Sequence, residues 1–137
     1  MEDNTAVEIH DSTLERIESD DGALVVVISA YVHRSPGRPS IDAGTGWSQT
    51  LQLRFRQGLA KGSVDTIPLE LLDGHLEVSG HRFDNIIPVP IEHPGPAKIE
   101  LRGWNGARVR IVGESVEVEL VGPARYLEEY PATEGAK

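Results

Sequence analysis

The alternation of apolar and polar residues with a period of two is the feature that most constrains the fold of this chain. Runs rich in valine, isoleucine and leucine are separated by glycine, proline, asparagine and aspartate about every ten residues. This pattern predicts an all-β fold, an antiparallel β-sandwich or flattened barrel of about nine to ten strands with at most one short helix. Only residues 12–19 and 124–130 have any helical character, and helices of that length are marginal in isolation. We expect one domain, 1–137, with ragged ends at 1–4 and 132–137.

Three segments indicate how the strands are buried. Residues 24–33 are apolar at both alternating sets of positions, which predicts a central strand covered on both faces. Residues 47–56 alternate apolar with polar side chains, so one face is expected in the core and the other in water. Residues 87–91 lie among prolines, which cannot donate to a ladder, and are expected to form an edge strand or a connector.

Two dipeptides between residues 97 and 121 have the composition of hairpin turns. Asn105-Gly106 and Gly113-Glu114 each separate alternating runs, which predicts a three-stranded meander. A three-residue loop at 104–106 keeps the apolar residues of both flanking strands on one face, whereas a two-residue loop would turn one set to solvent. The predicted partners are Leu101 with Val109, Glu100 with Arg110, Arg102 with Arg108, Val109 with Val118, and Arg110 with Glu117.

A third turn is expected at Asp73-Gly74, a preferred pair for a tight hairpin. In that hairpin Leu71 lies opposite Leu76, and Glu70 lies opposite Glu77. Carboxylates and imidazoles that project from one face of a hairpin can converge on a cation. The resulting metal-site hypothesis comprises Glu70, His75, Glu77 and His81, and the alternative is a solvated hairpin face.

Residues 34–46 form the longest segment without strand character, and long loops in compact domains are often functional. They join the central strand to the strand that begins at Trp47. Aromatic rings stack on the apolar faces of sugars, and aspartate accepts hydroxyl hydrogen bonds. The loop therefore suggests a site for a small polar ligand or a sugar, built from Tyr31, His33, Asp42 and Trp47, although Trp47 also fits the core.

The tripeptide His10-Asp11-Ser12 contains the residue types of a hydrolase triad, but its spacing does not suit one. In an extended chain the histidine and the serine point to one side and the aspartate to the other, whereas a triad places the imidazole between two oxygens. We expect Asp11 or Ser12 to bond the local backbone at a turn or bulge, with His10 partly buried. We assign no catalytic residue and no cofactor, and expect a protein that is not an enzyme.

The formal charge of −9 comes from the two ends of the chain. Residues 1–21 carry eight acids and one base, residues 113–137 six acids and two bases, and the middle eight acids and ten bases. This distribution lacks the basic face that nucleic acids need. Glu119 and Glu117, predicted opposite Arg108 and Arg110, neutralise the one candidate, which lies beside Trp104. The charge fits a basic protein partner, or serves solubility alone. Without a membrane segment, a signal peptide or any cysteine, we expect a cytoplasmic location and no membrane partner, and leave a homo-oligomer open.

Residues 10–18 read His-Asp-Ser-Thr-Leu-Glu-Arg-Ile-Glu, and an acidic turn separates them from Ala-Leu-Val-Val-Val-Ile-Ser-Ala-Tyr-Val-His at 23–33. This first quarter resembles uncharacterised bacterial all-β proteins that open with a His-Asp-Ser strand. Some of them look like immunity proteins of contact-inhibition toxin systems, so the resemblance implies a domain that binds another protein. The expected function is therefore non-enzymatic protein binding of an immunity or accessory type, and the alternative is a β-domain that binds a sugar, a small ligand or a metal.

Overall fold

The computed structural model describes residues 3–132, and these residues are almost entirely in antiparallel strands. The described part contains eleven strands, one 3-10 turn (η1, Val64–Thr66) and no α-helix, so no helix there could span a membrane. The all-β prediction is confirmed. In chain order the strands are β1 (Asn4–Asp20), β2 (Ala23–Ser35), β3 (Gly44–Arg56), β4 (Leu59–Gly62), β5 (Leu69–Val78), β6 (His81–Asp84), β7 (Ile86–Pro88), β8 (Ile91–His93), β9 (Ala97–Gly103), β10 (Arg108–Gly113) and β11 (Ser115–Tyr130).

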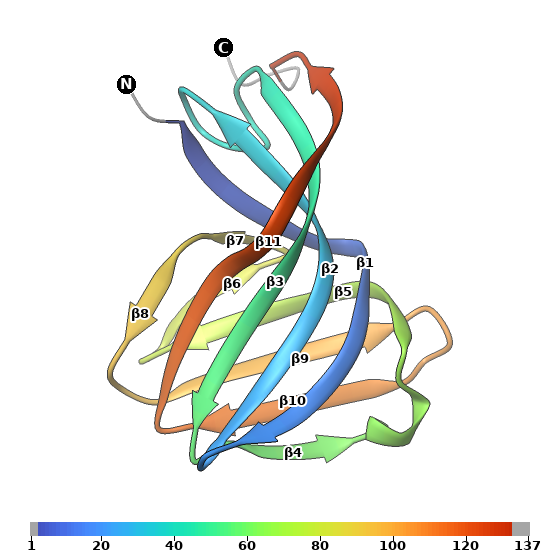
Figure 1. The fold of residues 1–137 in the computed structure, drawn as a ribbon, viewed down its shortest axis with the longest axis vertical. Coiled ribbons are helices and arrows are strands. Elements are labelled where there is room, and N and C mark those ends of the chain that lie inside the picture. Colours follow the sequence, from blue (N-terminus) through green and yellow to red (C-terminus); the bar gives the residue numbers. More distant parts are fainter. Residues whose placement is uncertain (1–2, 133–137) are drawn as a thin grey trace.

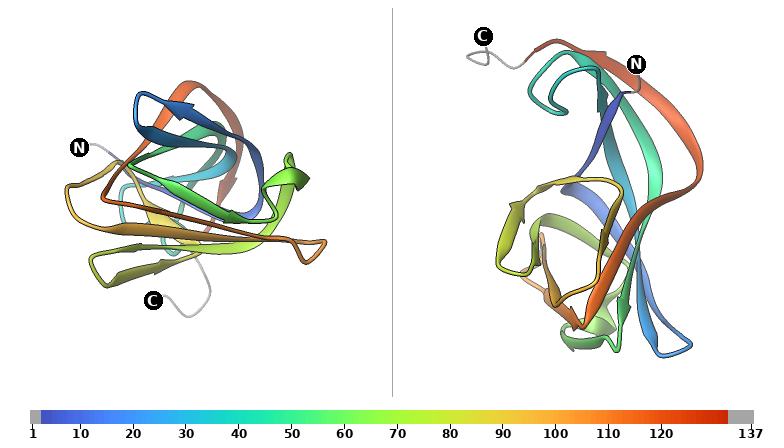
Figure 2. Two further views of the ribbon diagram at one scale, coloured as in Figure 1. Left: turned by 90° about the horizontal axis from the view of Figure 1, so that it is seen from below. Right: turned by 90° about the vertical axis from the view of Figure 1, so that its left-hand side faces the viewer.

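The strands form one hydrogen-bonded path, β4-β10-β9-β5-β1-β2-β3-β11-β8, with β6 on β5 and β7 on β1. The path is open, with β4 and β8 at its two ends, so the expected flattened barrel does not form. Four long strands, β1, β2, β3 and β11, cross over the shorter β4, β5, β9 and β10 (Figures 1 and 2). We call these the long-strand half and the short-strand half, the latter including β6. The ladder between the halves has two pairs, Thr13 with Glu70 and Leu14 with Leu69.

One hydrophobic core lies between the two halves. The long strands contribute Ile28, Leu53 and Phe55, and the short strands contribute Leu76 and Ile99, all without exposed surface. Burial of each such side chain stabilises the fold by about 1.5–3 kcal/mol relative to exposure. The faces of β9 and β10 that point away from this core are left in solvent, and they carry the charged side chains discussed below.

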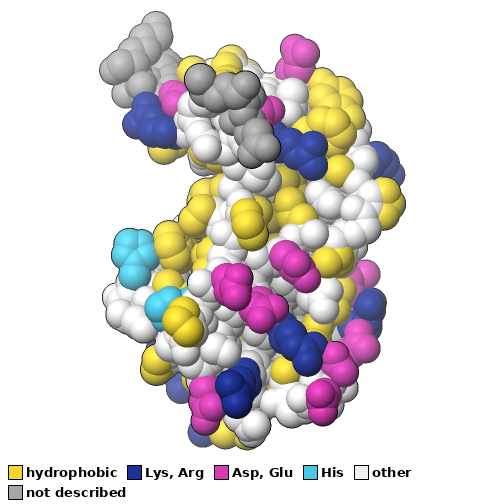
Figure 3. Space-filling model, turned by 60° about the vertical axis from the view of Figure 1, so that its left-hand side comes forward, with side chains coloured by type: hydrophobic (Ala, Val, Ile, Leu, Met, Phe, Trp, Pro, Cys, Tyr) yellow, Lys and Arg dark blue, Asp and Glu magenta, His cyan; other side chains and the backbone are white. Residues whose placement is uncertain are grey.

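The long strands continue past the core into a projecting end, which carries both described termini (Figure 1). It consists of residues 4–8, 31–35, 44–48 and 125–130 with the loop 36–43. Figure 3 shows the molecule hollowed between the projecting end and the body. This hollow, of about 600 Å³, is lined mainly by the start of β1 and by the proline-rich segment 86–90. The predicted ragged ends fall partly on residues 1–2 and 133–137, which lie outside the described residues.

The predictions for three segments are confirmed. β2 lies between β1 and β3, and both of its alternating sets are buried over residues 25–28. On β3, Leu51, Leu53 and Phe55 are fully buried, whereas the residues between them are not. Within residues 3–132, β7 pairs only with β1, and β8 only with β11, as expected of short segments among prolines.

The register of β9 and β10 is also as predicted. Leu101 pairs with Val109, Glu100 with Arg110, and Arg102 with Arg108. Gly106, with φ +86°, takes the left-handed conformation that this loop requires. Both flanking strands alternate apolar and polar residues, and only a three-residue loop places their apolar side chains on the same face of the sheet. The sequence alone was therefore enough to predict this register.

The predicted hairpin at Gly113-Glu114 is wrong. β10 pairs with β4 on its other side, and β11 pairs with β3, so Val109 and Val118 are not partners. At residue 113 the chain crosses from the short-strand half to the long-strand half, and the Glu114 N–H donates to the carbonyl of Arg56. A strand with alternating apolar and polar residues can pair equally well with any other strand that alternates in the same way. The pattern of β10 and β11 therefore did not show which strand each of them pairs with.

The predicted turn at Asp73-Gly74 is wrong as well. β5 runs through it, with a bulge in β5 between Leu71 and Asp73. The chain turns instead at Ser79-Gly80, where both residues have positive φ, as a tight hairpin turn requires. Leu71 and Leu76 are therefore not partners. The two segments with slight helical character, 12–19 and 124–130, belong to β1 and β11.

Candidate functional site

Two parallel rows of polar side chains cross the outer face of the short-strand half. They exist because outward positions on neighbouring antiparallel strands line up in register. The first row follows the pairing of β4, β10, β9, β5 and β6, and the second row lies two residues further along the strands. The first row is Lys61, Arg110, Glu100, His75 and Asp84, and the second is Arg108, Arg102 and Asp73.

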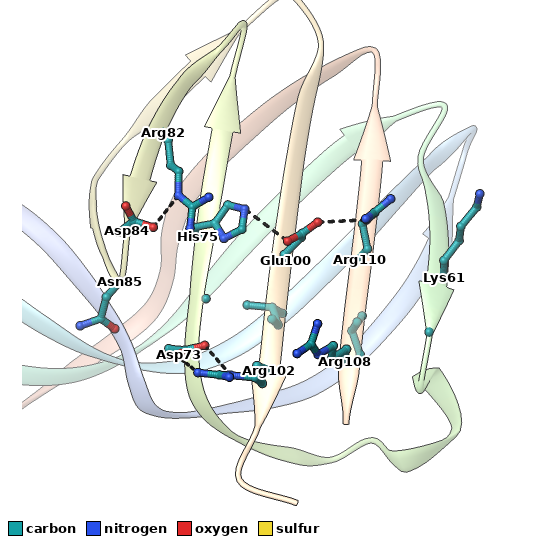
Figure 4. A pocket seen from close by; sticks show the side chains of 14 residues that line it. Lys61, Asp73, His75, Arg82, Asp84, Asn85, Glu100, Arg102, Arg108 and Arg110 are labelled. Carbon is teal, nitrogen blue, oxygen red and sulfur yellow. Dashed lines mark hydrogen bonds and ion pairs between the residues drawn. The ribbon is translucent and has the colours of Figure 1, made fainter. Parts of the chain in front are cut away.

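Ion pairs and hydrogen bonds order most of the first row. The Arg110 Nε donates to Glu100 Oε1 at 3.1 Å, and the His75 Nε2 lies 3.4 Å from Glu100 Oε2. The Arg82 Nε, from β6, donates to Asp84 Oδ1 at 2.6 Å. Glu100 is thus shared between two neighbouring strands, which fixes the middle of the row (Figure 4).

In the second row, Asp73 holds Arg102 with two bonds. The Arg102 Nη2 donates to Asp73 Oδ2 at 2.6 Å and its Nε to Asp73 Oδ1 at 3.2 Å. This carboxylate raises the pKa of Arg102, which stays charged. Arg108 lies directly opposite Arg102, and like charges in that position repel each other.

The space between the rows is a hollow of about 660 Å³, which we call the trough. The backbone and inward-pointing residues Gly62, Val109, Leu101 and Gly74 form its floor. Successive outward positions on a strand are about 7 Å apart, which is wide enough for a side chain or an extended backbone. Figure 4 shows the charged side chains of both rows on either side of this space.

The trough is locally basic in an acidic protein. It is lined by five of the thirteen lysines and arginines of the chain, against three acids. Among residues 3–132, neither Lys61 nor Arg108 has an ion pair or hydrogen bond from its side chain. The trough therefore has two cationic groups that can bind an anion without breaking an existing pair.

The residues of the metal-site hypothesis do not converge. Because β5 has no turn at residue 73, Glu70 lies beside Thr13 of β1, far along the strand from Glu77. Glu77 pairs with Lys98 at 3.5 Å, and the His81 ring packs on Phe83. His75 is drawn to Glu100 instead. In the described part of the chain, no three His, Asp or Glu side chains are grouped as a metal ion requires.

The residues of the ligand-site hypothesis separate into three places. Tyr31 and His33 lie on one face of β2, with ring centroids 4.8 Å apart. Trp47 pairs with Val32 and so lies on the opposite face, where the Arg34 guanidinium covers its ring at 4.5 Å. Asp42 stays within the loop and accepts the backbone N–H of Arg38 at 2.6 Å. The structure thus brings together only Tyr31 and His33.

A compact polar cluster surrounds Tyr31 and His33 in the projecting end. The His33 side chain is nearly buried, its Nε2 lies 2.9 Å from Glu8 Oε1, and its ring packs against Tyr130 at 5.2 Å. Burial, together with the carboxylate of Glu128, raises the pKa of Tyr31 to about 12. These contacts join the ends of three strands, and we assign the cluster a structural role.

The segment His10-Asp11-Ser12 forms a bulge in β1, as predicted. Asp11 has φ +64°, and the Ser12 hydroxyl donates to the carbonyl of Glu8 at 2.6 Å. The half-buried His10 donates from Nδ1 to the carbonyl of Leu72 at 2.7 Å, which is the main reason that its pKa is raised. Ser12 is thus bonded to the local backbone and His10 to the backbone of β5, rather than to one another.

Comparisons with protein-family models, with curated proteins and with solved structures gave no match. The trough is therefore argued from its own geometry. Sequence reasoning missed it because Glu119 and Glu117, expected opposite Arg108 and Arg110, lie instead on β11, beside β3, and only Glu100 is found opposite Arg110 as predicted. The alternating arginines at 108 and 110, with Arg102 predicted opposite Arg108, were the available signal.

Proposed function

We propose that this chain is a non-enzymatic domain that binds another protein through the trough. The observation that carries the proposal is a pair of cations, Lys61 and Arg108, which have no partner within the described residues and lie in a basic hollow of an acidic protein. Charged groups arranged this way contribute more to the choice of partner and to association rate than to raw affinity. The complementary feature on the partner is an acidic side chain.

The proposal differs from the basic partner that net charge alone favours. Net charge averages over the whole surface, whereas a partner contacts one face of it. The acids in excess lie mainly in residues 1–21 and 113–137, and β4 and β10 contribute three cations and no acid to the trough. If the partner is a toxin, as the resemblance of the first quarter implies, a toxin gene next to this one would support an immunity-type function.

Capture experiments with matched variants test the proposal. The double variant Lys61→Ala/Arg108→Ala removes the two unpartnered cations. The control Arg16→Ala/Arg125→Ala removes the same charge at exposed positions outside the trough. We expect a partner captured from a lysate of the source cells at low salt to be lost with the first variant, retained with the second, and released at high salt.

Retention of every captured protein by Lys61→Ala/Arg108→Ala would refute the trough as the binding surface. Circular dichroism of both variants checks that they are folded. Since both substituted side chains point into solvent, we expect melting temperatures within a few degrees of the unmodified protein.

The volume of the trough supports a second candidate, a small anionic ligand. Ligand pockets are typically about 300–1,000 Å³, and the trough, at about 660 Å³, falls within that range. A thermal-shift screen of mono- and dicarboxylates and inorganic phosphate tests this candidate. A rise in melting temperature that is lost in Lys61→Ala/Arg108→Ala would favour the small ligand over the protein partner.

A further inference from the structure

The charge of the trough changes sign along its length. At one end β4 and β10 contribute three cations and no acid, in the middle β9 contributes one of each, and at the other end β5 and β6 contribute two acids and one cation. The basic end comprises Lys61, Arg108 and Arg110, and the acidic end comprises Asp73, Asp84 and Arg82. A ligand that spans the trough therefore meets an attractive site for an anion first and for a cation second.

At the basic end, two of the three cations, Lys61 and Arg108, have no ion pair within residues 3–132. Arg110 already donates to Glu100, but Arg108 faces Arg102 across the ladder, and the Asp73 carboxylate is bonded to Arg102. A carboxylate placed beside Arg108 and Lys61 would accept charge-assisted hydrogen bonds and relieve the repulsion between the two arginines.

The acidic end discriminates between classes of anionic partner. Asp84 is exposed, and its only ion pair among the described residues is to Arg82 of the same strand. A uniformly anionic polymer laid along the trough would place a charge against Asp73 and Asp84, and like charges there cost affinity. The pattern favours a segment with one charge of each sign over a nucleic acid or a polyphosphate.

The spacing of those charges follows from the sheet. Neighbouring strands are about 4.8 Å apart, so the step from β10 to β5, across β9, is about 10 Å. An extended peptide advances about 3.3 Å per residue, and three residues cover that distance. We infer that the trough binds an extended segment of the partner protein with an acidic residue at its β10 end and a lysine or arginine three residues away at its β5 end.

This inference rests on the proposed function and is tested with model peptides rather than with the partner. The first probe has the core Glu-Gly-Gly-Lys, the second Glu-Gly-Gly-Glu, and the third Glu-Lys-Gly-Gly, all capped at both ends. Binding at millimolar peptide is followed through the backbone amide resonances of the full chain. We expect shifts at residues 61–62, 73–75, 100–102 and 108–110, and about two- to fivefold tighter binding of the first probe than of the other two.

Two variants separate the ends of the trough. Lys61→Ala/Arg108→Ala should weaken all three peptides. Asp73→Asn, which removes the acid on β5, should leave the di-acidic peptide bound at least as tightly and reduce the preference for Glu-Gly-Gly-Lys to near unity. The control Arg16→Ala/Arg125→Ala should change neither the affinities nor the order of the peptides.

Tighter binding of the di-acidic peptide, or of a single-stranded oligonucleotide, would overturn the inference, as would the absence of trough shifts with any peptide. These results differ from failure of the proposed function. If capture of a protein is lost with Lys61→Ala/Arg108→Ala but no preference for the mixed-charge peptide is found, the trough binds a partner of another charge pattern. If capture is unaffected, the proposed function itself fails.

Discussion

Replacing Gly46 by alanine tests how tightly the polar cluster of the projecting end is packed. Gly46 lies on β3 opposite His33, and its φ is not positive, so the backbone itself accepts alanine. A Cβ at this position would overlap the hydroxyl and the adjoining ring carbon of Tyr31. The Tyr31 ring cannot move away freely, because its edge packs on the His33 ring.

The expected magnitude combines two opposing terms. Overpacking in a well-packed site costs about 1–3 kcal/mol, whereas alanine in a strand is favoured over glycine by about 0.5–1 kcal/mol. The central values of these two ranges leave a net loss of about 1 kcal/mol in the free energy of unfolding of Gly46→Ala. In a Tyr31→Ala background the overlap is absent, so the same substitution should raise the free energy of unfolding by up to about 1 kcal/mol.

Urea unfolding of the four proteins, unmodified, Gly46→Ala, Tyr31→Ala and the double variant, measures both effects. With a slope of about 1.5 kcal/mol per molar urea, a cost of 1 kcal/mol moves the midpoint by about 0.7 M. The sign reversal between the two backgrounds is the decisive result. Equal costs in both backgrounds, or a Gly46→Ala protein as stable as the unmodified one, would refute the packing argument.

Three further predictions concern individual side chains. In an absorbance titration one tyrosine should ionise at about pH 12, the raised pKa of Tyr31, and this step should be absent from Tyr31→Phe. Because a tyrosine of the unfolded chain loses its proton near pH 10, the free energy of unfolding should fall as the pH rises above about 10. By NMR, His10 should titrate above its usual pKa, since its ring donates a hydrogen bond to the Leu72 carbonyl, and Asp11→Asn should remove only part of the shift in this pKa. The contribution of protonated His10 to stability is present at low pH and is lost as the pH rises through the raised pKa. Ile99→Ala in the core should lower the free energy of unfolding by about 2–5 kcal/mol in urea, and a loss below 1 kcal/mol would contradict its full burial.

The sequence was most informative where local patterns exclude the alternatives. The β9–β10 register followed from two alternating strands and one short loop, because any other loop length would have exposed an apolar face. The central position of β2 likewise followed from its apolar residues on both faces.

The errors arose where turn composition was taken as sufficient. Asp73-Gly74 has the residues of a tight turn but lies inside β5, where a Cβ on Gly74 would meet the Glu100 carbonyl at 2.8 Å. There glycine serves close packing between neighbouring strands rather than a turn, and a dipeptide does not distinguish these two uses.

The trough was beyond sequence reasoning for a related reason. Its charge depends on which strands lie beside β10, and β4 comes from residues 59–62, a segment for which no strand was predicted. Lys61 of β4, and not the expected Glu117, lies opposite Arg110. With a lysine in place of a glutamate beside β10, the outer face of the short-strand half is basic rather than neutral.

The two-pair ladder between β1 and β5 makes this protein a practical scaffold for engineering. Among residues 3–132, only Thr13 with Glu70 and Leu14 with Leu69 pair across a strand ladder between the two halves. The halves are otherwise held by side-chain packing in the core and by a few hydrogen bonds, among them His10 Nδ1 to the Leu72 carbonyl and Glu114 N–H to the Arg56 carbonyl. Outward positions on β4, β9 and β10 can therefore be substituted without changing the contacts of the long-strand half. A library randomised at positions 61, 100, 102, 108 and 110 would vary recognition while the fold is kept.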